Sequence, residues 1–181
     1  MSRVPLIDPA SASAQRQALL TQIHGAFGAT PNMFKAVANS PAALQSMWGS
    51  FGALGGGVIP AKLGEQIAVA VADRNACEYC LAAHTALGRK AGASAEEMSA
   101  AQAGHAADPR TAAALSFALK LVEARGQVSD ADVQAVRAAG YSDEEIVEIL
   151  AHVALNLFTN YVNVAFAVPV DFPAVPLRRA A

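Results

Sequence analysis

Frequent helix punctuation, with almost no strand signal, is the feature that most limits how this chain can fold. In Thr30-Pro31 and Ser40-Pro41 a hydroxyl side chain precedes a proline, so the hydroxyl can cap a helix that begins at the proline. The punctuation predicts an all-α fold. We expect helices over residues 13–24, from 31, 41–53, 60–74, from 77, 109–125, 132–138 and 142–167, then an extended tail at 168–181.

One short pattern occurs twice, at residues 91–97 and 139–145. In each copy a glycine suits the left-handed end of one helix, and Ser-x-x-Glu suits a capping box at the start of the next. The residues concerned are Gly92, Ser94 and Glu97 in the first copy and Gly140, Ser142 and Glu145 in the second. Duplication and independent use of good capping chemistry both explain the pattern.

The composition favours a single helical domain over residues 1–181. Hydrophobic residues make up 54% of the 181 residues, which is enough for a sizeable core. The net charge is −2 and only 15% of the residues are charged, so the basic face that nucleic-acid binding requires is missing. Because polar cover is scarce, we expect the chain to bury further apolar surface between the subunits of a homo-oligomer.

The first residues show no basic segment followed by an apolar run, so the sequence predicts a cytoplasmic protein rather than an exported one. The apolar run at 149–170 carries polar side chains that a lipid-facing helix would leave without partners, namely His152, Asn156, Asn160 and Asn163. We therefore expect a buried core helix there and no membrane span. In a reducing compartment a close cysteine pair is more often catalytic or metal-binding than structural.

Both cysteines of the chain, Cys77 and Cys80, lie in a short stretch that also contains His84. At about 100° per residue, these three positions fall within an arc of roughly 60° on one helical face. Glu65, on the preceding predicted helix, completes the pattern E-x11-C-x2-C-x3-H. We expect the functional chemistry in the helical hairpin formed by residues 60–92.

Besides redox catalysis, two other interpretations apply to Cys77 and Cys80. A structural disulfide closing only four residues would restrain the unfolded chain by roughly 2 kcal/mol, which is little for a core of this size. Zinc could take Cys77, Cys80 and His84 as ligands, with Glu65 as the fourth. Covalent haem attachment is excluded, because the residue after Cys80 is Leu81 rather than histidine.

A redox centre needs a thiol held partly as thiolate, a second thiol and a proton carrier. The segment from Cys77 to His84 supplies all three. If the helix begins near Cys77, both sulfurs lie in its first turn, where unpaired N–H groups favour thiolate. His84, one turn after Cys80, can take or return a proton. A carboxylate from Glu65 can orient the ring and support its imidazolium form.

Glu65, Cys77, Cys80 and His84 at these intervals resemble the alkyl hydroperoxidase D motif of the carboxymuconolactone decarboxylase-like superfamily. The stretches 140–145 and 156–173 are similar to its peroxidase-related branch, so the resemblance covers about residues 15–175. It implies an all-helical bundle, assembled as a trimer or hexamer. It also implies a cofactor-free antioxidant enzyme that reduces organic or hydrogen peroxides, with dihydrolipoamide or a small redox protein as the dithiol reductant.

The resemblance makes Cys80 the peroxidatic thiol, Cys77 the resolving thiol, His84 the proton carrier and Glu65 its partner. Thioredoxin-like logic would choose the earlier cysteine as nucleophile. We favour Cys80, because it lies one helical turn from His84.

Tyr79 stands where the best-known members of the family carry an additional histidine, and it can serve as a phenol donor or simply pack. This departure keeps an alternative open, a thiol-disulfide exchange or redox-sensing protein with little peroxidase activity. The decarboxylases of the superfamily do not depend on a cysteine pair, so the redox branch fits this chain better.

His152, Asn156 and Asn160 recur every four residues and form a polar stripe on the last predicted helix. Hydrogen bonding to helix ends or to a neighbouring subunit is the simplest interpretation of this stripe. Contact with a substrate is the alternative.

Overall fold

The chain forms a bundle of α-helices in a computed structural model that describes residues 1–178. The elements are the 3-10 turn η1 (Pro9–Ser11), α1 (Ala14–Phe27), α2 (Asn32–Val37), α3 (Pro41–Gly55), α4 (Ala61–Arg74), α5 (Glu78–Lys90), α6 (Ala95–Gln102), α7 (Pro109–Glu123), α8 (Asp130–Ala138) and α9 (Asp143–Ala165). The part of the chain that is described contains no strand, which confirms the predicted all-α class.

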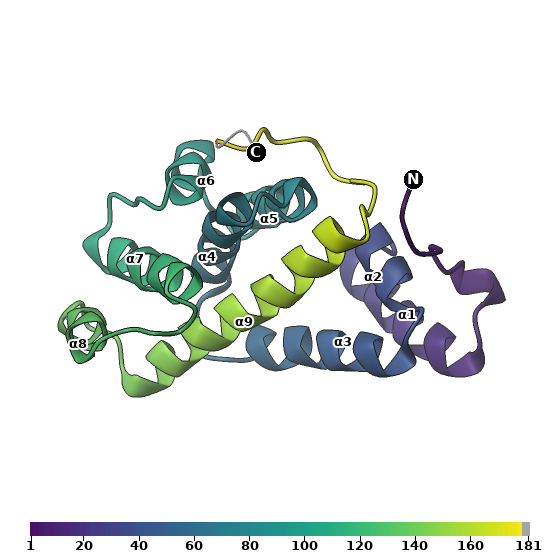
Figure 1. Cartoon of the computed structure of the whole chain (residues 1–181), viewed down its shortest axis with the longest axis horizontal. Coiled ribbons are helices and arrows are strands. Elements are labelled where there is room, and N and C mark those ends of the chain that lie inside the picture. Colours follow the sequence, from purple (N-terminus) through teal and green to yellow (C-terminus); the bar gives the residue numbers. More distant parts are fainter. Residues whose placement is uncertain (179–181) are drawn as a thin grey trace.

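Helix α4 is the centre of the bundle and packs against α5, α6, α7 and α9. Residues 66–73 of this helix are all buried. Figure 1 shows α9 running diagonally across the molecule, with α3 beside it, α1 and α2 at the N-terminal end, and α7 and α8 at the other end. Because α5 packs along α4, the hairpin of these two helices brings Glu65 and the cysteine stretch together.

Most predicted helix ends agree with the structure to within a few residues. The Ser40 hydroxyl accepts a hydrogen bond from the Ala43 N–H, as expected of an N-cap. Both copies of the repeated pattern form complete capping boxes. Gly92 and Gly140 have φ of 91° and 92°, the left-handed conformation predicted for them.

Two predicted helix boundaries are wrong. Thr30 does not cap α2, because Pro31 itself is the extended N-cap residue and the helix begins at Asn32. Helix α1 continues beyond the predicted end at residue 24 to Phe27, and its C-cap is Gly28, which has φ of 74°. Packing explains the extension, since the added turn carries Phe27 onto the rings of Phe34 and Trp48.

The turn between α4 and α5 falls at Asn75 and Ala76, as predicted, with Ala76 at φ of 51°. The Cys77 N–H donates to the Ala72 carbonyl at 2.9 Å and so closes the turn. Cys77 is extended, with φ of −95° and ψ of 90°, and is the N-cap of α5. The expectation that it shares a helical face with Cys80 is therefore corrected, because Cys77 precedes the helix.

The segment after α9 crosses the bundle in extended form, as the yellow end of the ribbon in Figure 1 shows. The Asp171 carboxylate accepts the Asn32 N–H at 2.8 Å, and the Arg178 N–H donates to Asp73 at 2.9 Å. Of the tail predicted at 168–181, residues 179–181 lie outside the described residues. Within residues 1–178, no helix has the length and apolar character needed to cross a membrane.

Candidate active site

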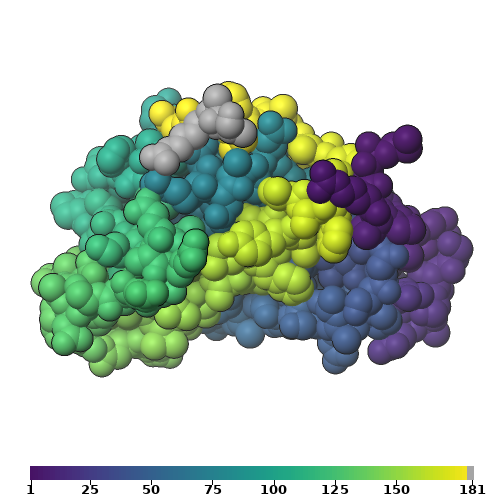
Figure 2. All heavy atoms as spheres, in the orientation of Figure 1, coloured from purple at the N-terminus to yellow at the C-terminus, as the bar shows by residue number. Residues whose placement is uncertain are grey.

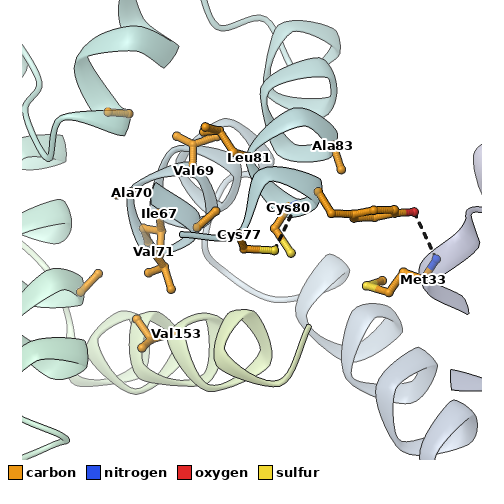
Figure 3. Close-up of a cluster of buried hydrophobic side chains, with 14 of the residues drawn as sticks. Met33, Ile67, Val69, Ala70, Val71, Cys77, Cys80, Leu81, Ala83 and Val153 are labelled. Carbon is orange, nitrogen blue, oxygen red and sulfur yellow. Dashed lines mark hydrogen bonds between the residues drawn. The ribbon is translucent and has the colours of Figure 1, made fainter. Parts of the chain in front are cut away.

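The two thiols lie together at the start of α5, next to a buried cluster that includes Ile67, Val71 and Leu81 (Figure 3). Both are free thiols, and Cys77 and Cys80 are only 1% and 2% exposed. The Cys80 N–H donates a hydrogen bond to the Cys77 sulfur at 3.3 Å. As the N-cap, the Cys77 sulfur takes the place that a serine hydroxyl occupies in an ordinary capped helix, and this holds the two sulfurs together.

His84 and Glu65 form an ion pair one helical turn from Cys80. The His84 Nδ1 lies 2.7 Å from the Glu65 Oε2, and the two side chains are 12% and 23% exposed. Helices α4 and α5 approach closely here because Gly88 has no side chain, since a Cβ at this position would meet the end of Met98 and lie 3.3 Å from the Glu65 Cβ. The structure thus brings together all four residues of the sequence motif.

The charges of the site favour a thiolate on one sulfur only. Burial disfavours the charged form of Cys80, but the hydrogen bond with Cys77, the charge of His84 and nearby amides lower its pKa to about 7. The hydrogen bond to Cys80 and burial raise the pKa of Cys77. Burial opposes charge on His84, yet the Glu65 carboxylate raises the pKa of the imidazole overall. A Cys80 thiolate beside a His84 imidazolium is therefore the favoured state.

Two amides of α9 add to the stability of this thiolate. The Asn163 Nδ2 donates to the Cys80 sulfur at 3.2 Å, and Asn163 is 4% exposed. The Asn75 amide donates to the Asn160 Oδ1 at 2.9 Å, which turns the Nδ2 of Asn160 away from Asn75, and Asn160 also lowers the pKa of Cys80. The sequence marked Asn163 only as a polar residue in an apolar run, and it placed Asn160 in the polar stripe of the last predicted helix.

Tyr79 packs in the wall beside the thiols and is 4% exposed. Its hydroxyl accepts the Met33 N–H at 3.2 Å, and its ring meets Phe172 of the tail edge-on at 5.7 Å. Burial raises its pKa above the ordinary value for tyrosine. Of the two roles considered for Tyr79, these contacts favour packing.

A small cavity, here called the inner cavity, adjoins Cys80 and His84. Its volume is about 30 Å³, which is near the volume of one water molecule. Its wall is largely aromatic, and the rings that line it are Phe27, Phe34, Phe51, Tyr79 and Phe172. A molecule that reaches the Cys80 sulfur through this cavity must therefore present a small reactive end.

The zinc interpretation requires at least three ligand side chains arranged around one point. Among residues 1–178, no group of three or more His, Cys, Asp or Glu side chains has such an arrangement. Glu65 instead pairs with His84, and Cys80 accepts the Asn163 amide. The arrangement suits proton and thiol chemistry.

The chain matches the model of the carboxymuconolactone decarboxylase family over residues 41–124, which include α3 to α7 and the whole cysteine motif. No curated protein matches it by sequence. One similar solved structure is an uncharacterized peroxidase-related protein from Ralstonia eutropha JMP134, described as an alkylhydroperoxidase AhpD core. It is 26% identical, with a TM-score of 0.84 over 94% of this chain and 92% of that one.

A peroxidase-related protein from Silicibacter sp. TM1040 is also 26% identical, with a TM-score of 0.81 over 93% of this chain and 91% of that one. The debrominase Bmp8 is 21% identical and covers 87% of both chains with a TM-score of 0.75, so it shares the fold. These comparisons confirm the resemblance read from the sequence. The central helices thus match the carboxymuconolactone decarboxylase family, and the overall fold is similar to that of the alkylhydroperoxidase-core and peroxidase-related proteins.

Proposed function

We propose that this protein is a thiol peroxidase in which Cys80 is the peroxidatic thiol and Cys77 the resolving thiol. The observation that carries the proposal is the environment of Cys80. Its pKa is lowered to about 7 although its side chain is buried, and the Cys77 sulfur touches its backbone N–H. A thiolate near neutral pH, a second thiol in contact and an ion-paired imidazole are the parts that peroxide reduction needs.

The reaction begins when the Cys80 thiolate attacks the terminal oxygen of a hydroperoxide. The O–O bond breaks, the sulfur keeps the hydroxyl as a sulfenic acid, and the His84 imidazolium gives its proton to the departing alkoxide. The Cys77 sulfur then attacks the Cys80 sulfur, an S–S bond forms, and the sulfenic oxygen leaves as water with the Cys77 proton. A dithiol reductant, either dihydrolipoamide-like or a small redox protein, returns two electrons and two protons.

The test is the reaction of the fully reduced protein with a peroxide. Hydrogen peroxide or cumene hydroperoxide should consume both thiols at one peroxide per chain, with free thiols counted before and after. Cys80→Ser should abolish the reaction, whereas Cys77→Ser should still form a sulfenic acid that dimedone traps. If Cys80→Ser still formed the sulfenic acid and Cys77→Ser did not, the two roles would be reversed.

A second candidate function is thiol-disulfide exchange or redox sensing with little peroxide turnover. Tyr79 supports it, because a packed tyrosine replaces the additional histidine of the best-known family members. Oxidised lipoamide and oxidised glutathione are the probes. Rapid oxidation of the thiol pair by either compound, together with negligible peroxide turnover, would favour exchange over peroxidase activity.

We also propose that the chain assembles as a homo-oligomer, a trimer or hexamer, through α9. This helix is uncovered on the face shown in Figure 2, and its exposed side chains include Val147 (66%), Leu150 (49%) and Tyr161 (61%). Apolar surface of this kind is typical of subunit contacts. Light scattering should give the mass of an oligomer, and Tyr161→Glu should lower that mass. A monomeric wild-type chain would contradict this proposal.

A further inference from the structure

A pocket between α4, α6 and the start of α7, here called the lateral pocket, shares no lining residue with the inner cavity at the thiols. Its volume is about 510 Å³, which is within the usual range of small-molecule sites. Apolar side chains form part of the wall, among them Pro60, Leu63, Ala100 and Ala106. The polar lining includes Lys62, Gln66, Glu96, Glu97 and Arg110. The peroxidase proposal uses none of these residues.

Gln66 is the polar side chain that sets this pocket apart. It lines the pocket and is only 5% exposed, and its amide has no hydrogen-bond partner among residues 1–178. Two amide atoms near the thiols, the Asn160 Nδ2 and the Asn163 Oδ1, also lack partners, but both are sealed from any probe. The amide atoms of Gln66 are not sealed in this way, so a molecule in the lateral pocket can contact them.

The helical period of α4 directs Gln66 into the pocket. Leu63 and Gln66 are three residues apart and therefore lie on the same face of the helix, and both line the lateral pocket. Glu65, one residue earlier than Gln66, is turned by about 100° and pairs with His84 instead. An amide that is buried without partners loses its bonds to water, and a leucine at position 66 would avoid this cost. A ligand that bonds to the amide removes the cost in another way.

The charges around the pocket favour a neutral ligand. Lys62 forms an ion pair with Glu97 at 2.7 Å. Arg110 pairs with Glu145. Neither cation is therefore left to bind an anion. The carboxylate of Glu96 also lines the pocket and repels carboxylates and phosphates.

We propose that the lateral pocket binds a small, neutral carboxamide through Gln66. The glutamine side chain presents an acceptor oxygen and a donor NH₂ group side by side in one plane. A ligand carboxamide matches both at once, because its N–H donates to the Gln66 Oε1 while its carbonyl accepts from the Gln66 Nε2. The apolar part of the ligand lies against Leu63 and Ala100. This site is separate from the thiols, so the proposal does not depend on peroxidase activity.

Three probes of similar shape test the chemistry, namely benzamide, acetophenone and benzoate. Acetophenone keeps the ring and the carbonyl but lacks the N–H, so saturation-transfer NMR titrations should show benzamide binding about fivefold more tightly. Benzoate should bind least. Gln66→Leu should remove the preference for benzamide over acetophenone, whereas Gln134→Leu, at an exposed position on α8, should keep it. Equal affinities of the wild-type protein for benzamide and acetophenone, or no binding of benzamide, would overturn the proposal.

The place of binding can be measured separately with ¹⁵N-labelled protein. The side-chain NH₂ signals of Gln66, identified by their loss in Gln66→Leu, should shift when benzamide is added. Ala100→Phe places a ring in the lateral pocket and should abolish benzamide binding, while Ala95→Phe, on the same helix but outside the pocket, should not. Melting temperatures show whether each variant is folded. Benzamide binding that leaves the Gln66 signals unmoved, or that persists in a folded Ala100→Phe variant, would show that the lateral pocket is not the site.

Discussion

The two sides of His84 differ in almost every physical property. On the thiol side the inner cavity holds about 30 Å³ within aromatic walls, and Cys80 is 2% exposed. On the other side a pocket of about 150 Å³ lies between α3, α4 and α9, and the Glu65 side chain that lines it is 23% exposed. The difference separates two tasks. Burial protects the Cys80 sulfur from solvent and large molecules, while the Glu65–His84 pair on the more open side can exchange protons with solvent.

Removing His84 should have the largest effect, because this residue borders both sides. We expect His84→Asn to slow oxidation of the thiols by hydrogen peroxide by about 100-fold, since both the proton donor and the charge opposite the thiolate are lost. Stopped-flow tryptophan fluorescence or thiol counting gives the rate. His105→Asn, at an exposed position, is the control and should react like the wild type. A rate within twofold of wild type for His84→Asn would remove the imidazole from the mechanism.

Glu65→Gln should have the next largest effect, and it tests the side of His84 that faces away from the thiols. The glutamine can still hydrogen-bond to His84, but the negative charge that raises the pKa of the imidazole is gone. Because imidazolium exists below its pKa, the variant should lose its proton donor at a lower pH than wild type. At pH 7.5 we expect a rate roughly tenfold lower.

The measurement for Glu65→Gln is the rate of peroxide reduction from pH 5 to 9. The falling limb of this profile should move to lower pH, whereas Glu144→Gln, at an exposed position, should leave it in place. An unchanged falling limb would show that the carboxylate does not control His84.

Asn163→Leu tests the thiol side by removing the amide donor while keeping the approximate size of the side chain. The donor favours the thiolate, so its loss should move the pKa of Cys80 upward from about 7 towards its ordinary value. Thiolate forms as the pH rises through the pKa, so the variant should carry less thiolate at pH 7 and react about fivefold more slowly.

The thiolate of Asn163→Leu can be followed by ultraviolet absorbance between pH 5 and 10. Cys77→Ser in both proteins isolates the signal of Cys80, and Gln134→Leu, on the surface of α8, is the control. A midpoint that stays near pH 7 would mean that the amide has a packing role only.

Phe172→Ala should have the smallest effect and tests how the tail closes the thiol side. The edge-on ring pair with Tyr79 contributes about 0.5–1.5 kcal/mol beyond buried area, so the free energy of unfolding should fall by at least a comparable amount. Opening the aromatic wall should make the thiols react severalfold faster with Ellman's reagent. Phe166→Ala, 37% exposed in the same segment, should not change that rate. Unchanged thiol reactivity in Phe172→Ala would mean that the tail does not restrict access.

Local sequence spacing was sufficient for much of the helical framework and for the four motif residues. Ser40, Ser94 and Ser142 cap helices as expected, because capping bonds join residues three positions apart. His84 follows Cys80 by four residues, and Glu65 meets it because a short turn folds α4 back onto α5. The first helix was predicted to end too early, at residue 24, because the contact that extends α1, Phe27 on Trp48, is not local.

What the sequence by itself determined is therefore the helical class, the identity of the reactive stretch and the pairing of Glu65 with His84. The position of His84 also favoured Cys80 as the nucleophile, but only the tertiary structure decided which amides and rings surround its sulfur. Asn163 lies 83 residues from Cys80 in the chain, and Phe172 and His152 are similarly remote from the cysteine motif. Such contacts depend on the packing of α9 and the tail against α4 and α5. A pattern of neighbouring residues contains no information about contacts between residues so far apart in the chain.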